Sequence, residues 1–374
     1  MVSLPVGPYA LTLPAIRGVQ SGREYYVTMV PMRMLSRQFL FNEGNLPAEL
    51  RAQRVINKAR IPEIVRYILN NPKSYLFSAI TASVDHRVSF KALLDYDSEG
   101  RIGLLSVPAD AQFLINDGQH RKAAIDVAIK ENPELARETI AVVLFVAAGL
   151  KRNQQMFADL NKYAIRPTRS LGVLYDDRDP SAILVRDLII KVPLFKDRIE
   201  KERTSVSYRS KNLLTLSAVY QATKALLGKK RKLESVTEDE ARLALEFWSE
   251  LPKHVPEWKM LLEGRATSTD LRRDYVHSHG VILLALGSAG NTLISQYPDD
   301  WKRCLRKLER VDWSRSNPVW EGRAMMGGRL SKALVNVVLA TNYIKKVLGL
   351  PLSKEEQRVE KGHLGGKVAE VIPK

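Results

Sequence analysis

The first 170 residues alternate between strand-like and helix-like patterns of apolar and polar positions. Alternating apolar residues around positions 9–20 and 24–31, separated by a Ser-Gly pair, predict a β-hairpin. Helical spacing over residues 61–69, followed directly by Asn-Asn-Pro, predicts a helix that ends there. This half of the chain is therefore expected to mix strands and helices.

A second group of elements follows in the same half. Short apolar runs predict strands at residues 75–82, 103–107 and 113–116, and a helix is predicted over residues 118–131. Residues 139–147 are almost continuously apolar, which is typical of a strand buried on both faces. The order of strand, helix and strand predicts an α/β element.

After about residue 175 the pattern becomes mainly helical. Apolar residues at three- and four-residue spacing predict helices over residues 212–227, 238–251, 279–288 and 334–348. All five tryptophans lie in this half. The change of pattern predicts an α+β fold with two domains: an α/β domain over residues 1–175 and a mainly helical, basic domain over residues 176–374.

Composition narrows the class of protein. The 374 residues carry a net charge of +17, which favours a polyanionic partner, and nucleic acid is the preferred one. No apolar run approaches the roughly 18 residues of a membrane span, and no secretory signal pattern is present, so a cytoplasmic protein without a membrane partner is expected. The single cysteine, Cys304, excludes a disulfide framework and a cysteine-based zinc cluster.

The most informative segment is Asp-Gly-Gln-His-Arg, which lies between a predicted strand and a predicted helix. Gly118 allows close approach of the backbone, and the helix start offers free N–H groups beside His120 and Arg121. Such a start attracts anions, phosphate above all. The alternative is a common Asp-Gly turn with a structural histidine and a solvated arginine. The candidate phosphate-binding or nucleotide-binding residues here are Asp117, Gly118, Gln119, His120 and Arg121.

This segment, followed by Lys-Ala-Ala, resembles the signature of the DGQHR-domain proteins, the family that includes DndB. Later segments at residues 154–161, 164–175, 209–216, 312–317 and 320–323 resemble the same family in the same order. The resemblance implies a DNA-binding negative transcriptional regulator of DNA phosphorothioation (sulfur-modification) genes. The implied partners are double-stranded operator or promoter DNA and other phosphorothioation proteins.

More distantly, the segment is similar to boxes of ParB and sulfiredoxin, which implies a ParB/sulfiredoxin-like fold for residues 1–175. In ParB-type domains a later helix supplies residues that bind the metal and the phosphates. At the corresponding place this chain has Asn153, Asp159 and Asn161. The resemblance thus implies that they share a cleft with His120 and Arg121. His-Arg replaces the Arg-Arg of ParB, so one phosphate is better supported than a triphosphate. Alternatively, Asn161 caps a helix and Asp159 pairs with a nearby base.

A rival function belongs to another class of protein. The same turn would serve a nucleotide-dependent (ATP or CTP) hydrolase or a DNA nickase of the modification system, using a nucleotide and a divalent metal. A scaffold subunit that recruits other modification proteins is a third alternative. The residues themselves assign no cofactor and no catalytic group. His277 and His279 lack companions at metal-ligand spacing, so no metal site is assigned.

Three basic groups are expected to hold DNA phosphates: the first over residues 162–169, the second over residues 224–232 and the third over residues 302–310. Residues 301–350 contain eleven Lys and Arg against three Asp and Glu, and four of these bases recur at helical spacing, which predicts one basic helix face. A solvated face is the alternative for any single charge run. A homodimer is expected because repressors usually pair two half-sites. The candidate DNA contacts are Lys162, Arg166, Arg169, Lys229, Lys230, Arg231, Lys232, Arg303, Arg306, Lys307, Arg310, Arg315, Arg323 and Arg329.

Overall fold

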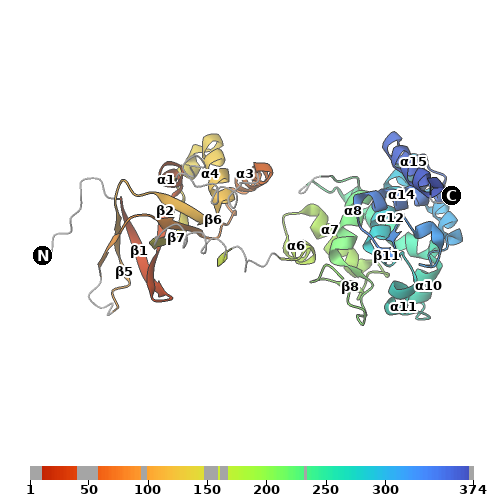
Figure 1. Cartoon of the computed structure of the whole chain (residues 1–374). Coiled ribbons are helices and arrows are strands. Elements are labelled where there is room, and N and C mark those ends of the chain that lie inside the picture. Colours follow the sequence, from red (N-terminus) through yellow and green to blue (C-terminus); the bar gives the residue numbers. More distant parts are fainter. Residues whose placement is uncertain are drawn as a thin grey trace. The chain divides into compact units, whose positions relative to one another are not determined.

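The computed structural model contains two compact units, Met1–Ile165 and Arg166–Lys374 (Figure 1). The division falls before helix α6 (Arg169–Tyr175) instead of after residue 175, because α6 contacts helices of the second unit. The structure describes residues 11–39, 58–93, 99–146, 159–160, 167–230 and 234–369.

The first unit is built on a mixed sheet, ordered β4-β5-β1-β2-β7-β3-β6. Its strands are β1 (Leu11–Gln20), β2 (Arg23–Pro31), β3 (Ile80–Val84), β4 (Ser89–Ala92), β5 (Ile102–Val107), β6 (Phe113–Asp117) and β7 (Thr139–Val146). Only β3 and β7 pair in parallel; the other pairs are antiparallel. The other elements are α1 (Met32–Gln38), η2 (Lys58–Arg60), α3 (Ile61–Asn70), α4 (Gln119–Glu131) and η3 (Pro133–Arg137).

The predicted hairpin and helices of this unit are confirmed. Ser21 and Gly22 join β1 to β2 with positive φ angles of 51° and 70°, as the tight turns that match strand twist require. Helices α1, α3 and α4 lie on one face of the sheet (Figure 1). Burial along β7 therefore alternates: Ile140, Val142 and Leu144 are buried, and the residues between them are not. The prediction of a strand buried on both faces was wrong.

Strand β3 begins at Ile80 and not at residue 75 as predicted. The carbonyl oxygens of Ser78 and Ala79 accept hydrogen bonds from the Arg121 guanidinium, at 2.8 and 3.1 Å. Carbonyls bonded to a side chain are less available to a neighbouring strand. The start of β3 is thus tied to the start of α4.

The second unit is mainly helical, as predicted. Its helices are α6, α7 (Pro180–Lys191), α8 (Leu216–Leu226), α9 (Glu238–Glu250), α10 (Pro256–Leu262), α11 (Ser268–Asp274), α12 (Gly280–Gln296), α13 (Trp301–Cys304), α14 (Leu334–Leu348) and α15 (Lys354–Ala369). The 3-10 turns are η4 (Leu251–His254), η5 (Leu305–Arg310) and η6 (Pro318–Trp320). Two-residue strands pair as β8 (Ile199–Glu200) with β9 (Leu214–Thr215) and β10 (Met325–Met326) with β11 (Arg329–Leu330).

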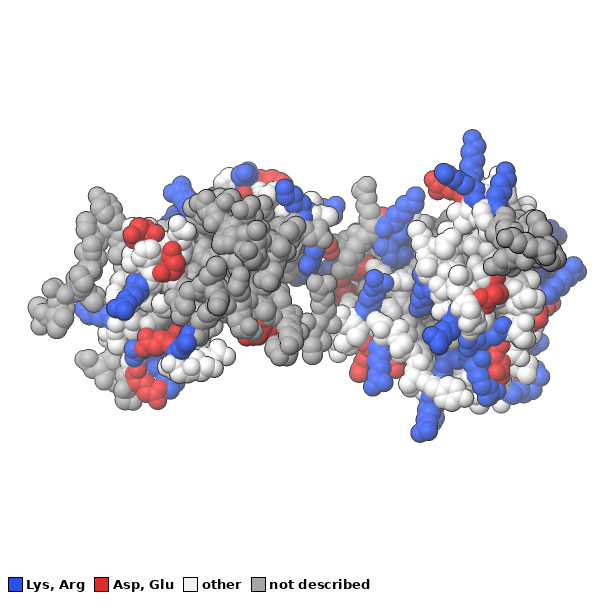
Figure 2. Space-filling view, viewed as in Figure 1, with Lys and Arg blue, Asp and Glu red and all other residues white. Residues whose placement is uncertain are grey.

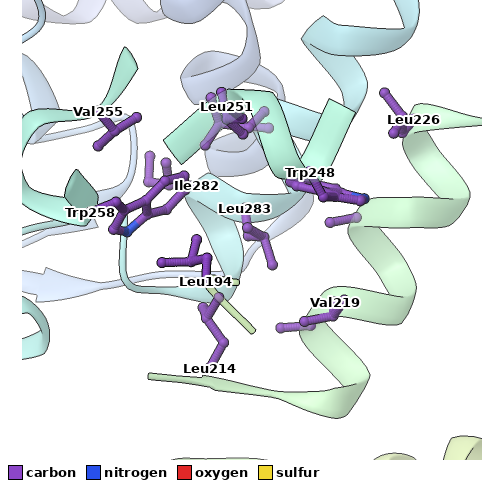
Figure 3. Close-up of a cluster of buried hydrophobic side chains, with 14 of the residues drawn as sticks. Leu194, Leu214, Val219, Leu226, Trp248, Leu251, Val255, Trp258, Ile282 and Leu283 are labelled. Atoms are coloured by element: carbon purple, nitrogen blue, oxygen red, sulfur yellow. The ribbon is translucent and has the colours of Figure 1, made fainter. Parts of the chain in front are cut away.

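Helix α12 lies at the centre of this unit and contacts both α8 and α14. Nine of its residues are buried, on most of its circumference, and a narrower stripe that includes Ser288, Asn291 and Ser295 is partly exposed. A side chain at Gly287 would collide with the backbone carbonyl of Ala222, so glycine allows α12 to approach α8 closely. Trp248 and Trp258 pack in one cluster with residues of α12 (Figure 3). The Trp248 indole donates to Thr223 Oγ1 at 3.1 Å, which satisfies its buried N–H group.

Replacing Gly287 by alanine is expected to destabilise the protein by about 1–3 kcal/mol, because the added methyl group forces α12 away from α8. Gly172 is the matched control: it lies exposed in α6, with nothing within 4 Å of an added Cβ. There, alanine is expected to be neutral or to stabilise by up to about 1 kcal/mol. Urea unfolding of both variants measures the difference, and equal effects would contradict the central role of the α8–α12 contact.

Candidate functional site

The turn at residues 117–121, called the DGQHR turn below, joins β6 to α4 as predicted. Gly118 is the N-cap of α4 and has a φ of 104°, which disfavours any residue with a side chain. A Cβ there would also lie 3.0 Å from Ile80 Cγ1 and 3.3 Å from Arg121 Nη2. The glycine therefore lets the arginine fold back over the turn.

Arg121 is held by the protein itself. Its guanidinium donates to Asp117 Oδ2 at 2.6 Å and to the two carbonyls before β3, and it also contacts the Ser78 hydroxyl. The side chain is only 16% exposed. In this arrangement Arg121 connects β6, the lead into β3 and α4, so it has a structural role. A phosphate ligand would have to compete with Asp117 for it.

His120 lies in a partly buried and basic environment. Burial lowers the pKa of its imidazole, and the nearby positive charge of Arg60 lowers it further. Gln119 donates two long hydrogen bonds, of 3.4 and 3.3 Å, to carbonyls at the end of β6. Asp159 is exposed. Asn153 and Asn161 lie outside the described residues, so the cleft shared with the DGQHR turn stays a prediction.

Several predicted DNA contacts lie on the surface of the second unit. Arg169, Lys230, Arg306, Arg310 and Arg329 are exposed. Within the described part of the chain, none of these five forms an ion pair. Figure 2 shows lysine and arginine side chains spread over the visible face of this unit, among fewer acidic ones.

The predicted basic helix near residue 305 has a different geometry from the one expected. α13 ends at Cys304, and the chain continues as the tighter 3-10 turn η5. The four predicted contacts, Arg303, Arg306, Lys307 and Arg310, therefore do not share one α-helical face. All four are exposed, but two have protein partners: Arg303 pairs with Asp300 at 2.8 Å, and Lys307 donates to the Leu348 carbonyl at 2.8 Å. Arg306 and Arg310 remain available for phosphate.

The second basic group is only partly available. Lys229 forms an ion pair of 2.6 Å with Glu240, which leaves its side chain 15% exposed. The remaining members of the first two groups, Lys162, Arg166, Arg231 and Lys232, lie outside the described residues.

A pocket of about 440 Å³ lies in the second unit. Its lining includes four cationic side chains, Arg272, Arg273, Arg315 and Lys332, and no acidic residue; we call it the basic pocket. Of these four, only Arg315 was among the predicted contacts. The others come from distant segments, without a spacing that a pattern search detects.

The two histidines left unassigned by the sequence have structural roles. His277 is fully buried between the rings of Tyr275, Trp258 and Trp313. His279 is the N-cap residue of α12, and burial lowers its pKa to about 4, so it is neutral at pH 7. Within the described residues, no group of three or more His, Cys, Asp or Glu side chains is placed to hold a metal ion.

A family model described as "DndB: DNA-sulfur modification-associated" matches residues 13–351. The chain belongs to the DndB family. The match spans both units, so it includes the DGQHR turn and the basic pocket. No curated protein and no solved structure matches the chain. The likeness of residues 1–175 to ParB and sulfiredoxin therefore stays a prediction.

No helix among the described residues is long and apolar enough to cross a membrane. The DndB family is associated with DNA sulfur modification, and a role in that process fits the basic chain.

Arg323, predicted as a DNA contact, is buried in this DndB-family chain, and that prediction was wrong. The side chain is 8% exposed and donates to both oxygens of Glu360, at 3.0 and 2.6 Å, and to the Leu339 carbonyl at 3.0 Å. Glu360 lies on α15, beyond the end of the family match, and also accepts from Asn342 and Lys346. Arg323 therefore anchors α15.

Glu360→Gln is expected to destabilise the protein by about 3–5 kcal/mol at neutral pH, because it leaves the Arg323 charge buried without its partner. Burial alone would raise the pKa of Glu360, but hydrogen bonds from Arg323, Lys346 and Asn342 outweigh it and hold the pKa at about 2. This pKa is below the ordinary 4.5. The contribution of ionised Glu360 to the free energy of unfolding is therefore complete above pH 5 and is lost as the pH falls toward 2.

Urea unfolding between pH 7 and pH 3 measures this effect. The wild-type protein should lose more stability over that range than the Glu360→Gln variant does. Glu355, exposed on the same helix, provides the control, and Glu355→Gln should behave like wild type. The same loss in both variants would show that the buried ion pair is not important.

Proposed function

We propose that this chain is a DNA-binding negative regulator of the genes of a DNA phosphorothioation system. Membership in a family associated with DNA sulfur modification supports the biological setting. The observation that supports DNA binding is the excess of Lys and Arg over Asp and Glu in the second unit. It contains 38 of the 58 Lys and Arg and 26 of the 41 Asp and Glu. Double-stranded promoter or operator DNA is the partner that fits this charge.

Exposed Lys and Arg side chains of this unit can bind the phosphate backbone of DNA. Arg306, Arg310, Arg329 and Lys230 are exposed and have no acidic partner within the described residues, so binding a phosphate requires no internal ion pair to break. Lys and Arg side chains that neutralise phosphates release counterions and so give affinity. The DNA sequence is recognised by other contacts, made with the edges of the nucleobases. In the proposal these four residues hold the duplex.

Two further parts of the proposal concern assembly. A homodimer would present two copies of the basic surface to two half-sites, as is usual for repressors. Other proteins of the phosphorothioation system are the second class of partner, in keeping with the family's association.

The described contacts favour a regulator over the alternative of a nucleotide hydrolase or DNA nickase at the DGQHR turn. Such an enzyme needs a cation free to stabilise charge on the transferred phosphoryl group. The Arg121 guanidinium is instead bound by Asp117 and by two backbone carbonyls. The turn is better suited to holding the sheet and α4 together.

The double variant Arg306→Ala/Arg310→Ala is expected to weaken DNA binding about 10-fold or more at 100 mM salt. Each lost phosphate contact should also reduce the slope of log affinity against log salt by about one. Fluorescence anisotropy with a labelled duplex from the promoter of the modification genes measures both quantities.

The matched control is Arg242→Ala/Arg265→Ala. It removes the same charge from two exposed arginines that already pair with Asp239 and Glu263. We expect this control to bind DNA nearly as well as wild type. Equal weakening by both double variants would mean that net charge alone matters and that the proposed contacts are wrong.

A further inference from the structure

The basic pocket is formed by segments that are far apart in the sequence. One wall comes from residues 204–208, and the floor includes Leu213 and Leu214, just before α8. Another wall is formed by α11, with Thr269, Arg272 and Arg273. The start of α12, Arg315 and Lys332 complete the pocket. The pocket is thus a feature of the folded unit and not of one loop.

Arg272 brings a buried positive charge to this pocket without an acidic partner. The side chain is 9% exposed, and its guanidinium donates to the carbonyls of Ser207, Tyr208 and Ser210 at 3.2, 3.0 and 2.9 Å. No ion pair within the described part of the chain includes it. Carbonyl dipoles satisfy its N–H groups but leave its charge uncompensated.

Arg315 and Lys332 add two more cations. Arg315 donates to the carbonyls of Arg273 and Gly328 at 3.4 and 3.2 Å. The Lys332 ammonium lies over the backbone at the start of α12, since a Cβ on Gly280 would be 2.6 Å from Nζ. Neither forms an ion pair with an acid among the described residues. Arg273, by contrast, is paired with Asp274 at 2.7 Å.

The start of α12 also carries a partial positive charge, like the N-terminus of any α-helix. The helix has 17 residues, and its first N–H groups have no partner inside the helix. His279, its N-cap residue, donates from Nε2 to the Arg272 carbonyl at 3.0 Å, since a carbonyl oxygen can only accept, and burial keeps the imidazole neutral. Three unpaired cations and a helix start therefore surround one cavity that no acid lines. Asp274, outside the lining, attracts Arg315, and an anion in the cavity would offset the remaining repulsion among the cations.

We propose that the basic pocket binds a phosphorylated small molecule of the size of a mononucleotide. The phosphate would lie between Lys332, Arg315 and the start of α12, and the rest of the ligand would lie against Val206, Tyr208 and Leu213. A cavity of about 440 Å³ is within the range of small-molecule sites and is too small for a duplex. The proposal is independent of DNA binding and of the DGQHR turn, and it gives the regulator a site for a small effector.

The test uses the full-length protein and isothermal titration with the four ribonucleoside 5′-monophosphates, without metal. At least one should bind saturably at one site. The corresponding nucleoside, which lacks the phosphate, should bind at least 10-fold more weakly. A competition experiment then compares an oligonucleotide with and without a 5′-phosphate. If only the phosphorylated form displaces the nucleotide, the natural ligand is the phosphate of a DNA end. If neither form displaces it, the natural ligand is a free nucleotide.

Lys332→Gln and Arg315→Gln should each weaken nucleotide binding about 10-fold or more. Lys302→Gln, which removes an exposed lysine paired with Glu246 outside the pocket, should not. Arg306→Ala/Arg310→Ala should keep nucleotide binding, which separates this proposal from the DNA surface. Without ligand, Lys332→Gln should keep or raise the thermal midpoint, because it removes repulsion among the cations.

Three results would overturn the proposal. One is no saturable binding of any of the four nucleotides at millimolar concentration. Another is binding of the nucleoside as tight as that of the nucleotide, which would mean that the phosphate is not recognised. The third is equal weakening by Lys302→Gln, which would show an unspecific effect of charge.

Discussion

The close contact between α12 and α8 determines the arrangement of the second unit. Gly287 lets α12 approach the backbone of α8 at Ala222, and most of the circumference of α12 is then buried. A buried helix has a fixed position, so its first residue is fixed as well. Gly280 lies beside Ala218 of α8 and under the Lys332 ammonium, and this places the start of α12 in the basic pocket. Apolar burial thus holds like charges together at the pocket.

Two physical classes of cation matter most for DNA binding. Some are buried or partly buried and paired with an acid of the protein, such as Arg323 with Glu360 and Arg121 with Asp117, and these hold elements together. Others are exposed without an acidic partner within the described residues, such as Arg306 and Arg310. Unlike the first class, the second can neutralise phosphates without breaking an internal ion pair. A net charge of +17 is therefore a guide to the partner but not to the contact residues.

Local signals in the sequence predicted much of the fold. The Ser-Gly pair set the hairpin, and the spacing of apolar residues found α8, α9, α12 and α14. Predictions failed where distant segments decide the outcome. Burial along β7 depends on which sheet face the helices cover, and the burial of Arg323 depends on Glu360, 37 residues later. The basic pocket was missed for the same reason, since only the packed helices bring Arg272, Arg315 and Lys332 together.

The central claim is that the second unit neutralises several DNA phosphates at once. It is tested most directly by measuring the affinity of the full-length protein for duplex promoter DNA between roughly 50 and 200 mM salt. If several phosphates are contacted, the affinity should fall by orders of magnitude, with a linear dependence of log affinity on log salt. A complex whose affinity is the same across this range, or the absence of any complex at the lower salt concentration, would contradict the account.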